Sequence, residues 1–221
     1  MQKYDPSALQ AKVMIGIPSR NNSMWGSSAL ALAAMCTTTA YHAPNVKMVL
    51  NVAVGTALCM NRIKLCKDAV KEGCTHVLFL DDDMVFPMHT LIHFINHGLP
   101  IVAANCARKE LPPRSNSRAL DGVSVLWTRK NSTGIEEVDY VGTGVMLINT
   151  DVLKALPQPW FAEIYNPLTE TSKGEDVFFC ELAKRHGFKA YIDHDISKEI
   201  GHIGGFEYRH QQNEIEWEKA S

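Results

Sequence analysis

The sequence predicts an α/β fold in which strands and helices alternate along the chain. In its first half, short apolar runs alternate with stretches of helical periodicity, and the connections between them are short. This order favours parallel strands joined by right-handed crossovers. Hydrophobic residues make up 46% of the 221 positions and charged residues 21%, which is typical of a globular protein rather than a disordered or coiled-coil chain.

Four strands and three helices are predicted in the first half. The first strand ends at Pro18, the second helix stops at Gly73, and Pro87 suits the first turn of the third helix. The carboxyl ends of parallel strands meet at one edge of a sheet, where binding sites form. Residues 18–22 and 81–83 should therefore lie along one edge. The expected strands are 12–17, 46–52, 75–80 and 100–105, and the expected helices are 25–41, 56–72 and 87–98.

The second half has a less regular pattern. Residues 108–120 are polar and interrupted by prolines, so we expect a long loop, of the kind that is usually functional or mobile. Strand-like segments follow at 123–145, with a turn around 131–134, and a glycine-led strand is expected at 142–149. Beyond these, the pattern predicts a helix at 176–186, a strand at 188–193 and a charged C-terminal tail.

Charge and cysteine usage narrow the setting in which the chain works. The 22 basic and 24 acidic side chains give a net charge of −2, which excludes a broadly cationic surface for nucleic acid but leaves room for a local patch. No stretch approaches the roughly 18 apolar residues of a membrane span, and no apolar signal-peptide core is present, so we expect a cytoplasmic protein without a membrane partner. The six cysteines contain no C-x-x-C pair and are interpreted as reduced thiols.

The strongest chemical signal is the segment FLDDDM, in which three aspartates follow an apolar run. In an extended chain Asp81 and Asp83 would share a face and Asp82 would point away. Crowded carboxylates resist joint ionisation unless a cation offsets them, and their oxygens suit magnesium or manganese. The alternative is a solvated acidic turn. The position at the end of a predicted strand favours metal binding.

A second acidic pair lies in SKGEDVFF, at the start of a predicted helix. Ser172 and Glu175 fit a helix capping box, and acidic groups suit a helix N-terminus through the dipole. That interpretation explains Glu175 better than Asp176. Asp176 could instead act as a general base towards a hydroxyl group, and the residues alone leave the two interpretations even.

Isolated basic residues give weaker signals. His202 stands between glycines in IGHIGG, and glycines let the backbone approach a ligand closely. Arg20 follows the first strand and Arg62 lies inside the second helix, where either could meet a phosphate. For Arg62 the simpler interpretation is a surface arginine, and for His202 a loop histidine.

Several other chemistries find no support in the sequence. It contains no G-x-x-x-x-G-K-[ST] phosphate loop, no G-x-G-x-x-G after a strand and no G-x-S-x-G elbow, and the GTG at 142–144 is too short for a dinucleotide fingerprint. His89, His93 and His97 form an i, i+4, i+8 stripe opposite an apolar face, so we expect them to face solvent rather than bind zinc.

Taken together, six motifs resemble the nucleotide-sugar-dependent glycosyltransferases with the GT-A fold, close to family 2 and its phage and bacterial relatives. They are IPSRN, MNR, FLDDDM, VGTGVMLIN, GEDVFF and GHIGG, and their order matches that of the family across residues 13–205. The resemblance implies a mixed central sheet flanked by helices in a single domain over 1–221. Its nucleotide-binding half would be about 12–105, its acceptor and catalytic half 106–205 and its tail 206–221.

The resemblance also implies roles for individual residues. Asp176 matches the general base of inverting members, with Glu175 beside it as a second catalytic residue. Asp81, Asp83 and His202 would hold Mn²⁺ or Mg²⁺, which stabilises a departing diphosphate. The expected donor-binding residues are Pro18, Ser19, Arg20, Arg62, Asp81, Asp82, Gly142, Thr143 and Gly144.

The activity implied is the transfer of one hexosyl or pentosyl group from a nucleoside diphosphate sugar, with UDP as the expected nucleotide, to an acceptor hydroxyl. Family 2 enzymes often carry a Q-x-x-R-W-type motif after the acidic pair, and its absence here favours a single transfer over processive synthesis. The acceptor is left open among a glycan, a small molecule and a hydroxylated base in phage-type DNA. Expected acceptor residues are Trp160, which could stack on a sugar ring, and Arg108 and Arg114 in the basic loop, which could contact a nucleic acid or an anionic glycan. From the residues alone, a solvated basic loop is the favoured interpretation.

Two other functional classes compete with this interpretation. A sugar-phosphate nucleotidyltransferase shares the architecture and would release pyrophosphate, but no glycine-rich loop follows the first strand to cradle a triphosphate. A non-catalytic nucleotide- or glycan-binding module would bind its ligand without turnover.

Overall fold

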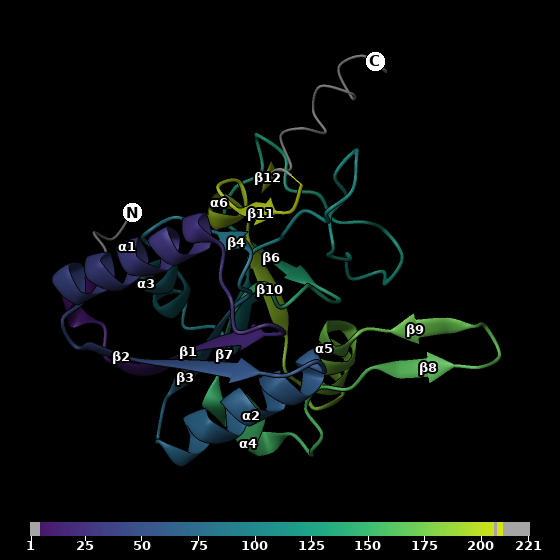
Figure 1. Cartoon of the computed structure of the whole chain (residues 1–221), viewed down its shortest axis with the longest axis horizontal. Coiled ribbons are helices and arrows are strands. Elements are labelled where there is room, and N and C mark those ends of the chain that lie inside the picture. The colour runs from purple at the N-terminus through teal and green to yellow at the C-terminus, as the bar shows by residue number, and fades with distance from the viewer. Residues whose placement is uncertain (1–4, 206, 210–221) are drawn as a thin grey trace.

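The computed structural model describes residues 5–205 and 207–209, and its centre is a seven-stranded mixed sheet flanked by helices (Figure 1). The strand order is β2-β1-β3-β7-β5-β10-β6. This confirms the predicted α/β class with a mixed central sheet flanked by helices. The strands are β1 (Ala11–Ser19), β2 (Val46–Val54), β3 (His76–Leu80), β5 (Ile101–Ala103), β6 (Ile135–Val138), β7 (Val145–Asn149) and β10 (Ala190–Asp193).

Strand directions place the candidate motifs at one edge of this sheet. β1 pairs in parallel with β2 and β3, as predicted, and β5 pairs in parallel with β10. β7 lies antiparallel between β3 and β5, and β6 is antiparallel to β10. β7 is antiparallel to both β3 and β5, so β3 and β5 run in the same direction. The strands that the first half contributes to this sheet therefore run in the same direction, as predicted, and β7 from the second half lies between β3 and β5. The carboxyl ends of β1, β3 and β5 therefore meet at the same edge of the sheet.

Helices cover both faces of the sheet and define two cores. On one face, α1 (Gly26–His42), α3 (Thr90–Asn96) and α6 (His194–Ser197) contribute to one apolar cluster. On the other face, α2 (Leu58–Lys71), α4 (Thr150–Ala155) and α5 (Glu175–Arg185) contribute to a second cluster. Figure 1 shows α1 and α3 above the sheet and α2 and α4 below it. Gly73 follows α2 with φ +66°, which is the left-handed conformation expected of a helix-ending glycine.

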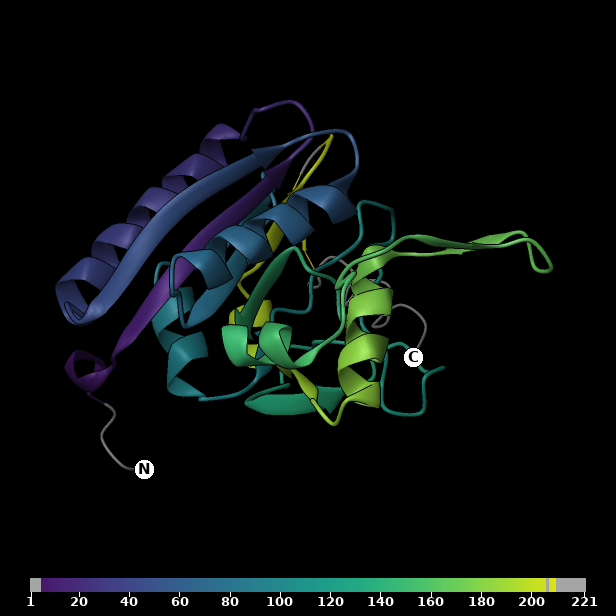
Figure 2. The same cartoon turned by 90° about the horizontal axis from the view of Figure 1, so that it is seen from below.

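Two smaller sheets, both unpredicted, complete the fold. A three-stranded sheet of order β12-β11-β4 joins β4 (Met84–Val85), β11 (Gly201–Ile203) and β12 (Glu207–Tyr208). A hairpin of β8 (Ile164–Asn166) and β9 (Thr171–Lys173) projects from the body of the molecule just before α5 (Figure 2). A single 3₁₀ turn, Pro6–Ala8, precedes β1.

The predicted long loop at 108–120 is confirmed, and a buried side chain fixes its path. Asn105, fully buried at the end of β5, accepts hydrogen bonds from the Ser115 hydroxyl at 2.6 Å and the Ser117 hydroxyl at 2.9 Å. Its Nδ2 donates to the Leu126 carbonyl at 2.9 Å. These contacts hold the loop against the sheet edge although it contains no helix or strand of its own.

Three further predictions concern the cysteines, membrane-spanning helices and the C-terminal tail. All six cysteines are unpaired, four of them buried, in agreement with reduced thiols. None of the described helices combines the length and the apolar character needed to cross a bilayer. The predicted tail, 206–221, lies outside the described residues except for 207–209.

The histidine stripe on α3 differs from its prediction. His89, His93 and His97 are partly buried, and the His97 Nε2 lies 2.9 Å from the Asp193 Oδ2. The expectation of a solvent-facing stripe is wrong, because α3 packs this side near β10 and α6. His97 is paired with a buried carboxylate that also caps α6.

Candidate functional site

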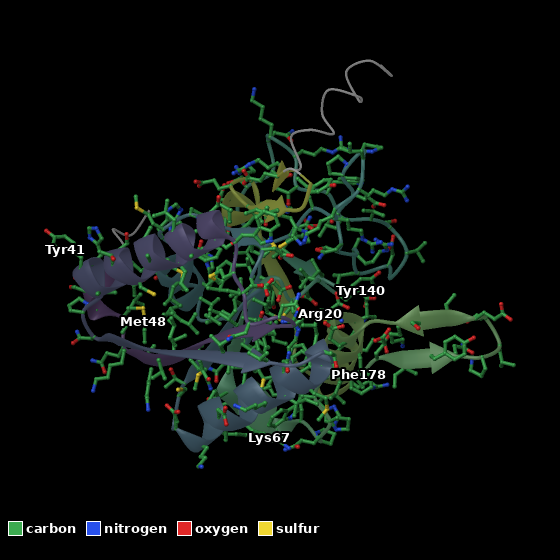
Figure 3. The ribbon with its side chains drawn as sticks, viewed as in Figure 1. Arg20, Tyr41, Met48, Lys67, Tyr140 and Phe178 are labelled. Atoms are coloured by element: carbon green, nitrogen blue, oxygen red, sulfur yellow. The ribbon has the colours of Figure 1, made fainter. Side chains whose placement is uncertain are left out.

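A cavity of about 260 Å³ opens at the carboxyl edge of the sheet. Four of the predicted donor residues, Pro18, Arg20, Asp81 and Asp82, line it, and Arg20 is labelled in Figure 3. Asn21, in the IPSRN motif, also lines it; the sequence places this residue at the edge but assigns it no role. Sequence reasoning missed the rest of the wall, which comes from the β1–α1 connection and the start of α2: Ser23, Trp25 and Leu58.

The three aspartates all line this cavity, but each has a different partner. Asp81 pairs with Arg62, Asp82 accepts a hydrogen bond from the Ser19 hydroxyl at 2.7 Å, and Asp83 contacts Lys109. The expectation that Asp82 points away is wrong, because the chain turns here instead of staying extended: the Met84 amide donates to the Asp81 carbonyl at 3.2 Å. Burial raises the pKa of Asp82, and the neighbouring aspartates add to this effect, while the Ser19 hydrogen bond opposes it.

Asp83 and His202 form the candidate cation site. Strand β11 pairs with β4, and the Ile203 amide donates to the Asp83 carbonyl at 2.8 Å, so the small sheet brings His202 to the end of β3. The His202 Nε2 lies 3.4 Å from the Asp83 Oδ1. The His202 Nδ1 lies 2.8 Å from the Ala107 carbonyl, which can only accept, so Nδ1 donates there and Nε2 faces Asp83.

These two side chains fit a divalent cation. The Asp83 Oδ1 is buried and has no hydrogen-bond partner among the described residues, so a carboxylate oxygen is available to a ligand. Burial opposes ionisation of Asp83, but contacts with His202 and Lys109 outweigh it and lower the pKa of the carboxyl. Within 5–205 and 207–209, no group of three or more His, Cys, Asp or Glu side chains is arranged for a metal. Asp83 and His202 are thus the two closest candidate ligands, and Asp81, whose Oδ1 contacts Arg62, lines the same cavity and stays a predicted third ligand.

Arg62 is the least expected member of the site. Its side chain is only 2% exposed, it does not line the donor cavity, and it lies over the Phe79 ring with its Cζ 5.3 Å from the centroid. Its Nη2 is 3.0 Å from the Asp81 Oδ1 and its Nε is 3.4 Å from the Glu175 Oε1. The surface interpretation is thus wrong, and donor binding by Arg62 stays a prediction. Burial opposes the charge of Arg62, but Asp81 and Glu175 outweigh it and raise the guanidinium pKa.

A second cavity, of about 560 Å³, lies where the hairpin meets α5. It contains Asp176, whose Oδ1 accepts a hydrogen bond from the Val177 amide at 2.7 Å. Burial raises the pKa of Asp176, and the charge of Glu175 adds to this effect, so the carboxylate is a stronger base than usual. The cavity is lined by Arg108, Asn116, Tyr140, Ser172, Lys173, Gly174, Asp176 and Val177, of which Tyr140 is labelled in Figure 3.

The capping-box interpretation of Ser172 and Glu175 is wrong. Ser172 belongs to β9, the N-cap of α5 is Gly174, and no side-chain hydrogen bond caps this helix. Glu175 reaches Arg62 instead. A side chain at Gly174 would place its Cβ 2.8 Å from the Asp176 Oδ1, so glycine leaves room for the carboxylate. The acidic pair at this helix start is therefore divided: Asp176 lines the second cavity, whereas Glu175 pairs with Arg62.

Residues 142–144 connect the two cavities without lining either of them. The Gly144 carbonyl accepts a hydrogen bond from the Asp81 amide at 2.9 Å, and Thr143 is only 3% exposed. A Cβ on Gly142 would lie 2.0 Å from the Asn116 Nδ2. The segment supports Asp81 on one side and lies against Asn116 on the other, and its predicted donor role stays a prediction.

One predicted acceptor residue is contradicted by its surroundings. Trp160 is 5% exposed, packs in the core and donates from its Nε1 to the Leu156 carbonyl at 3.3 Å, so it cannot stack on a sugar. Arg114 is exposed, pairs with Glu110 at 3.6 Å and lines neither cavity, and its acceptor role stays a prediction. Of the three residues predicted to bind the acceptor, only Arg108 lies beside Asp176.

Comparisons with known proteins support the fold only. No protein-family model and no curated protein sequence matches the chain. Among solved structures, it is similar to A197 from STIV, with a TM-score of 0.57 and 18% identity over 87% of this chain and 86% of that one. S. aureus TarS 1-349 in complex with UDP-GlcNAc gives a TM-score of 0.44 and 15% identity, over 83% of this chain and 56% of that one. The chain thus has an α/β fold like that of A197.

Proposed function

We propose that the chain is a metal-dependent glycosyltransferase that moves one sugar from a nucleoside diphosphate sugar to an acceptor hydroxyl. The observation that carries the proposal is that two neighbouring cavities are lined by different kinds of side chain. One is lined by three aspartates and His202, and the other contains a single basic carboxylate, Asp176. The two are joined through Arg62, which contacts Asp81 and the residue preceding Asp176.

The donor side fits a nucleotide carrying a diphosphate. Asp83 and His202 would hold Mn²⁺ or Mg²⁺, and the remaining ligands would come from diphosphate oxygens and water. When bound, such a cation acts as a Lewis acid that stabilises the leaving diphosphate. Lys109, which contacts Asp83, adds a positive charge at the same place. Pro18, Arg20 and Trp25 form the wall that would face the nucleoside.

The acceptor side supplies the base. The acceptor oxygen attacks the anomeric carbon, a new C–O bond forms, and the bond to the diphosphate oxygen breaks with its electron pair leaving on the nucleoside diphosphate. Asp176 takes the proton of the hydroxyl group in this step. Because the sugar is transferred in a single displacement, the anomeric carbon is inverted. The raised pKa of Asp176 suits this role, because a stronger base accepts the proton more readily. Glu175 is held by Arg62 and keeps the helix start in place rather than exchanging protons.

Product analysis tests this proposal against its alternatives. Purified protein is incubated with Mn²⁺ and a panel of nucleotide sugars, with UDP-sugars first, and the products are separated by chromatography. Release of nucleoside diphosphate, in transfer or in slow hydrolysis by water, is expected. Release of pyrophosphate from a nucleoside triphosphate and a sugar phosphate would identify a nucleotidyltransferase. Binding without turnover would identify a binding module.

Matched variants connect the products to the site. Asp176→Asn should abolish transfer while leaving nucleotide binding intact, because Asp176 lies outside the donor cavity. Asp151→Asn makes the same change on α4, where the Asp151 side chain is 78% exposed and pairs with Lys154. We expect this control to behave as the unchanged protein does.

A further inference from the structure

The basic loop, residues 108–120, contains one arginine whose side chain, unlike those of its basic neighbours, has no partner in the described part of the chain. Lys109 contacts Asp83, Arg114 pairs with Glu110, and Arg118 lies over the Tyr140 ring with its Cζ 5.7 Å from the centroid. The side chain of Arg108 makes no hydrogen bond, ion pair or ring contact with the described part of the chain, although it lines the cavity that contains Asp176. Its charge is therefore available to a ligand.

The other polar groups of this cavity do not neutralise Arg108. Asp176 accepts its hydrogen bond from the Val177 amide and forms no ion pair with Arg108 within the described residues. Lys173, on the opposite wall, places its ammonium 2.7 Å from both oxygens of Glu181, so its charge is compensated locally. The cavity thus combines one uncompensated guanidinium with one carboxylate base.

An amide in the same wall is also without a partner. The Asn116 Oδ1 is buried and has no hydrogen-bond partner in the described ranges. The side chain lies against Gly142, where a Cβ would come within 2.0 Å of the Asn116 Nδ2, so only glycine leaves room for the amide at this wall. A buried polar group in this state costs free energy unless a ligand satisfies it.

We propose that the acceptor is anionic and that Arg108 binds its phosphate or carboxylate group while its hydroxyl lies at Asp176. This inference rests on the proposed function and specifies the acceptor. A guanidinium presents paired N–H donors that match the oxygens of such a group, and charge-assisted hydrogen bonds of this kind are about twice as strong as neutral ones. The Asn116 amide contacts the same molecule. The volume of about 560 Å³ falls in the range of small-molecule sites, so it takes one acceptor unit.

A titration with inorganic phosphate tests the inference directly. The chain, free of metal and nucleotide, is labelled with ¹⁵N, and the amide signals of Arg108, Asn116 and Lys173 are followed as phosphate is added. We expect saturable shifts at these positions and at least a tenfold weaker phosphate affinity in Arg108→Gln, with partial recovery in Arg108→Lys. Because the Arg108 side chain is exposed, the thermal unfolding of Arg108→Gln should match that of the unchanged chain.

A control variant and two competitors sharpen this test. Arg185→Gln makes the same charge change at the far end of α5, where the side chain is exposed, and should leave phosphate binding unchanged. A hexose phosphate and a short oligonucleotide are then added separately, since a small molecule and a polymer present the same group. Displacement of phosphate by either one identifies the source of the anion. Displacement by neither would mean an adventitious ion only and would overturn the inference.

Failure of this inference is distinguishable from failure of the proposed function. Absence of shifts at the cavity, or equal affinity in Arg108→Gln, would overturn the anionic acceptor even if UDP binds with Mn²⁺ at the donor cavity. Phosphate binding that depends on Arg108, in a chain that binds no nucleoside diphosphate, would keep the anion site and remove the glycosyltransferase.

Discussion

The buried guanidinium of Arg62 gives a stability prediction whose size follows from the structure. Arg62→Met keeps much of the apolar stem but removes the positive charge, which leaves Asp81 and Glu175 without the group that lies 3.0 Å from one and 3.4 Å from the other. Breaking a buried ion pair costs about 3–5 kcal/mol. The two carboxylate side chains are 30% and 22% exposed, so water screens part of the repulsion. We therefore expect the lower end, about 3 kcal/mol of unfolding free energy.

Urea denaturation at pH 7 measures this loss. With a slope of about 3 kcal/mol per molar urea, the midpoint should fall by about 1 M with little change in slope. Arg62→Lys keeps the charge but not the planar fork and should cost less. Adding Asp81→Asn and Glu175→Gln to Arg62→Met removes the repulsion and should recover part of the loss. A loss under about 1 kcal/mol in Arg62→Met, or no recovery in the triple variant, would refute the bridging role.

Three further predictions concern single positions. Gly142→Ala would place a Cβ 2.0 Å from the Asn116 Nδ2 and should cost about 1–3 kcal/mol in urea denaturation. Gly26→Ala, with open space around its Cβ, is the matched control and should cost nothing. The raised pKa of Asp176 means that the folded state binds this proton more tightly than the unfolded state does, so its ionised form weakens the fold as pH rises. Asp176→Asn should therefore raise the melting temperature at pH 7. In the unchanged chain, kcat/KM should fall as the pH decreases, with a midpoint above the ordinary aspartate pKa. A midpoint at the ordinary aspartate pKa would exclude Asp176 as the base. Trp160→Ala should cost about 3–5 kcal/mol, because the ring is only 5% exposed, whereas Trp160→Phe should leave the KM for the acceptor unchanged.

Local signals in the sequence were enough to predict most elements of the first half. The strands that became β1, β2 and β3 are apolar runs bounded by proline, glycine or charged residues, and Gly73 ends α2 as expected. The position of β7 could not be predicted in the same way, because its antiparallel place between β3 and β5 depends on contacts distant in sequence. The hairpin of β8 and β9 was missed because its strands are short, polar and exposed.

The candidate site was also predictable only where local signals mark its residues. Asp81–Asp83 were found because they directly follow an apolar strand, and His202 because of the resemblance, although its place beside Asp83 needs the pairing of β11 with β4. Arg62 was misjudged because a helix pattern places a charge on a face without revealing what that face meets. Asn116 carries no motif at all, and its importance appears only where the loop packs against Gly142.

The central claim, a donor site in which Asp83 and His202 hold a divalent cation, is tested most directly by calorimetric titration of UDP into the chain with Mn²⁺ and with EDTA. We expect binding that requires Mn²⁺, a loss of at least tenfold in affinity in Asp83→Asn, and no change in Asp151→Asn. UDP binding that is equally tight in EDTA, or unaltered in Asp83→Asn, would contradict it.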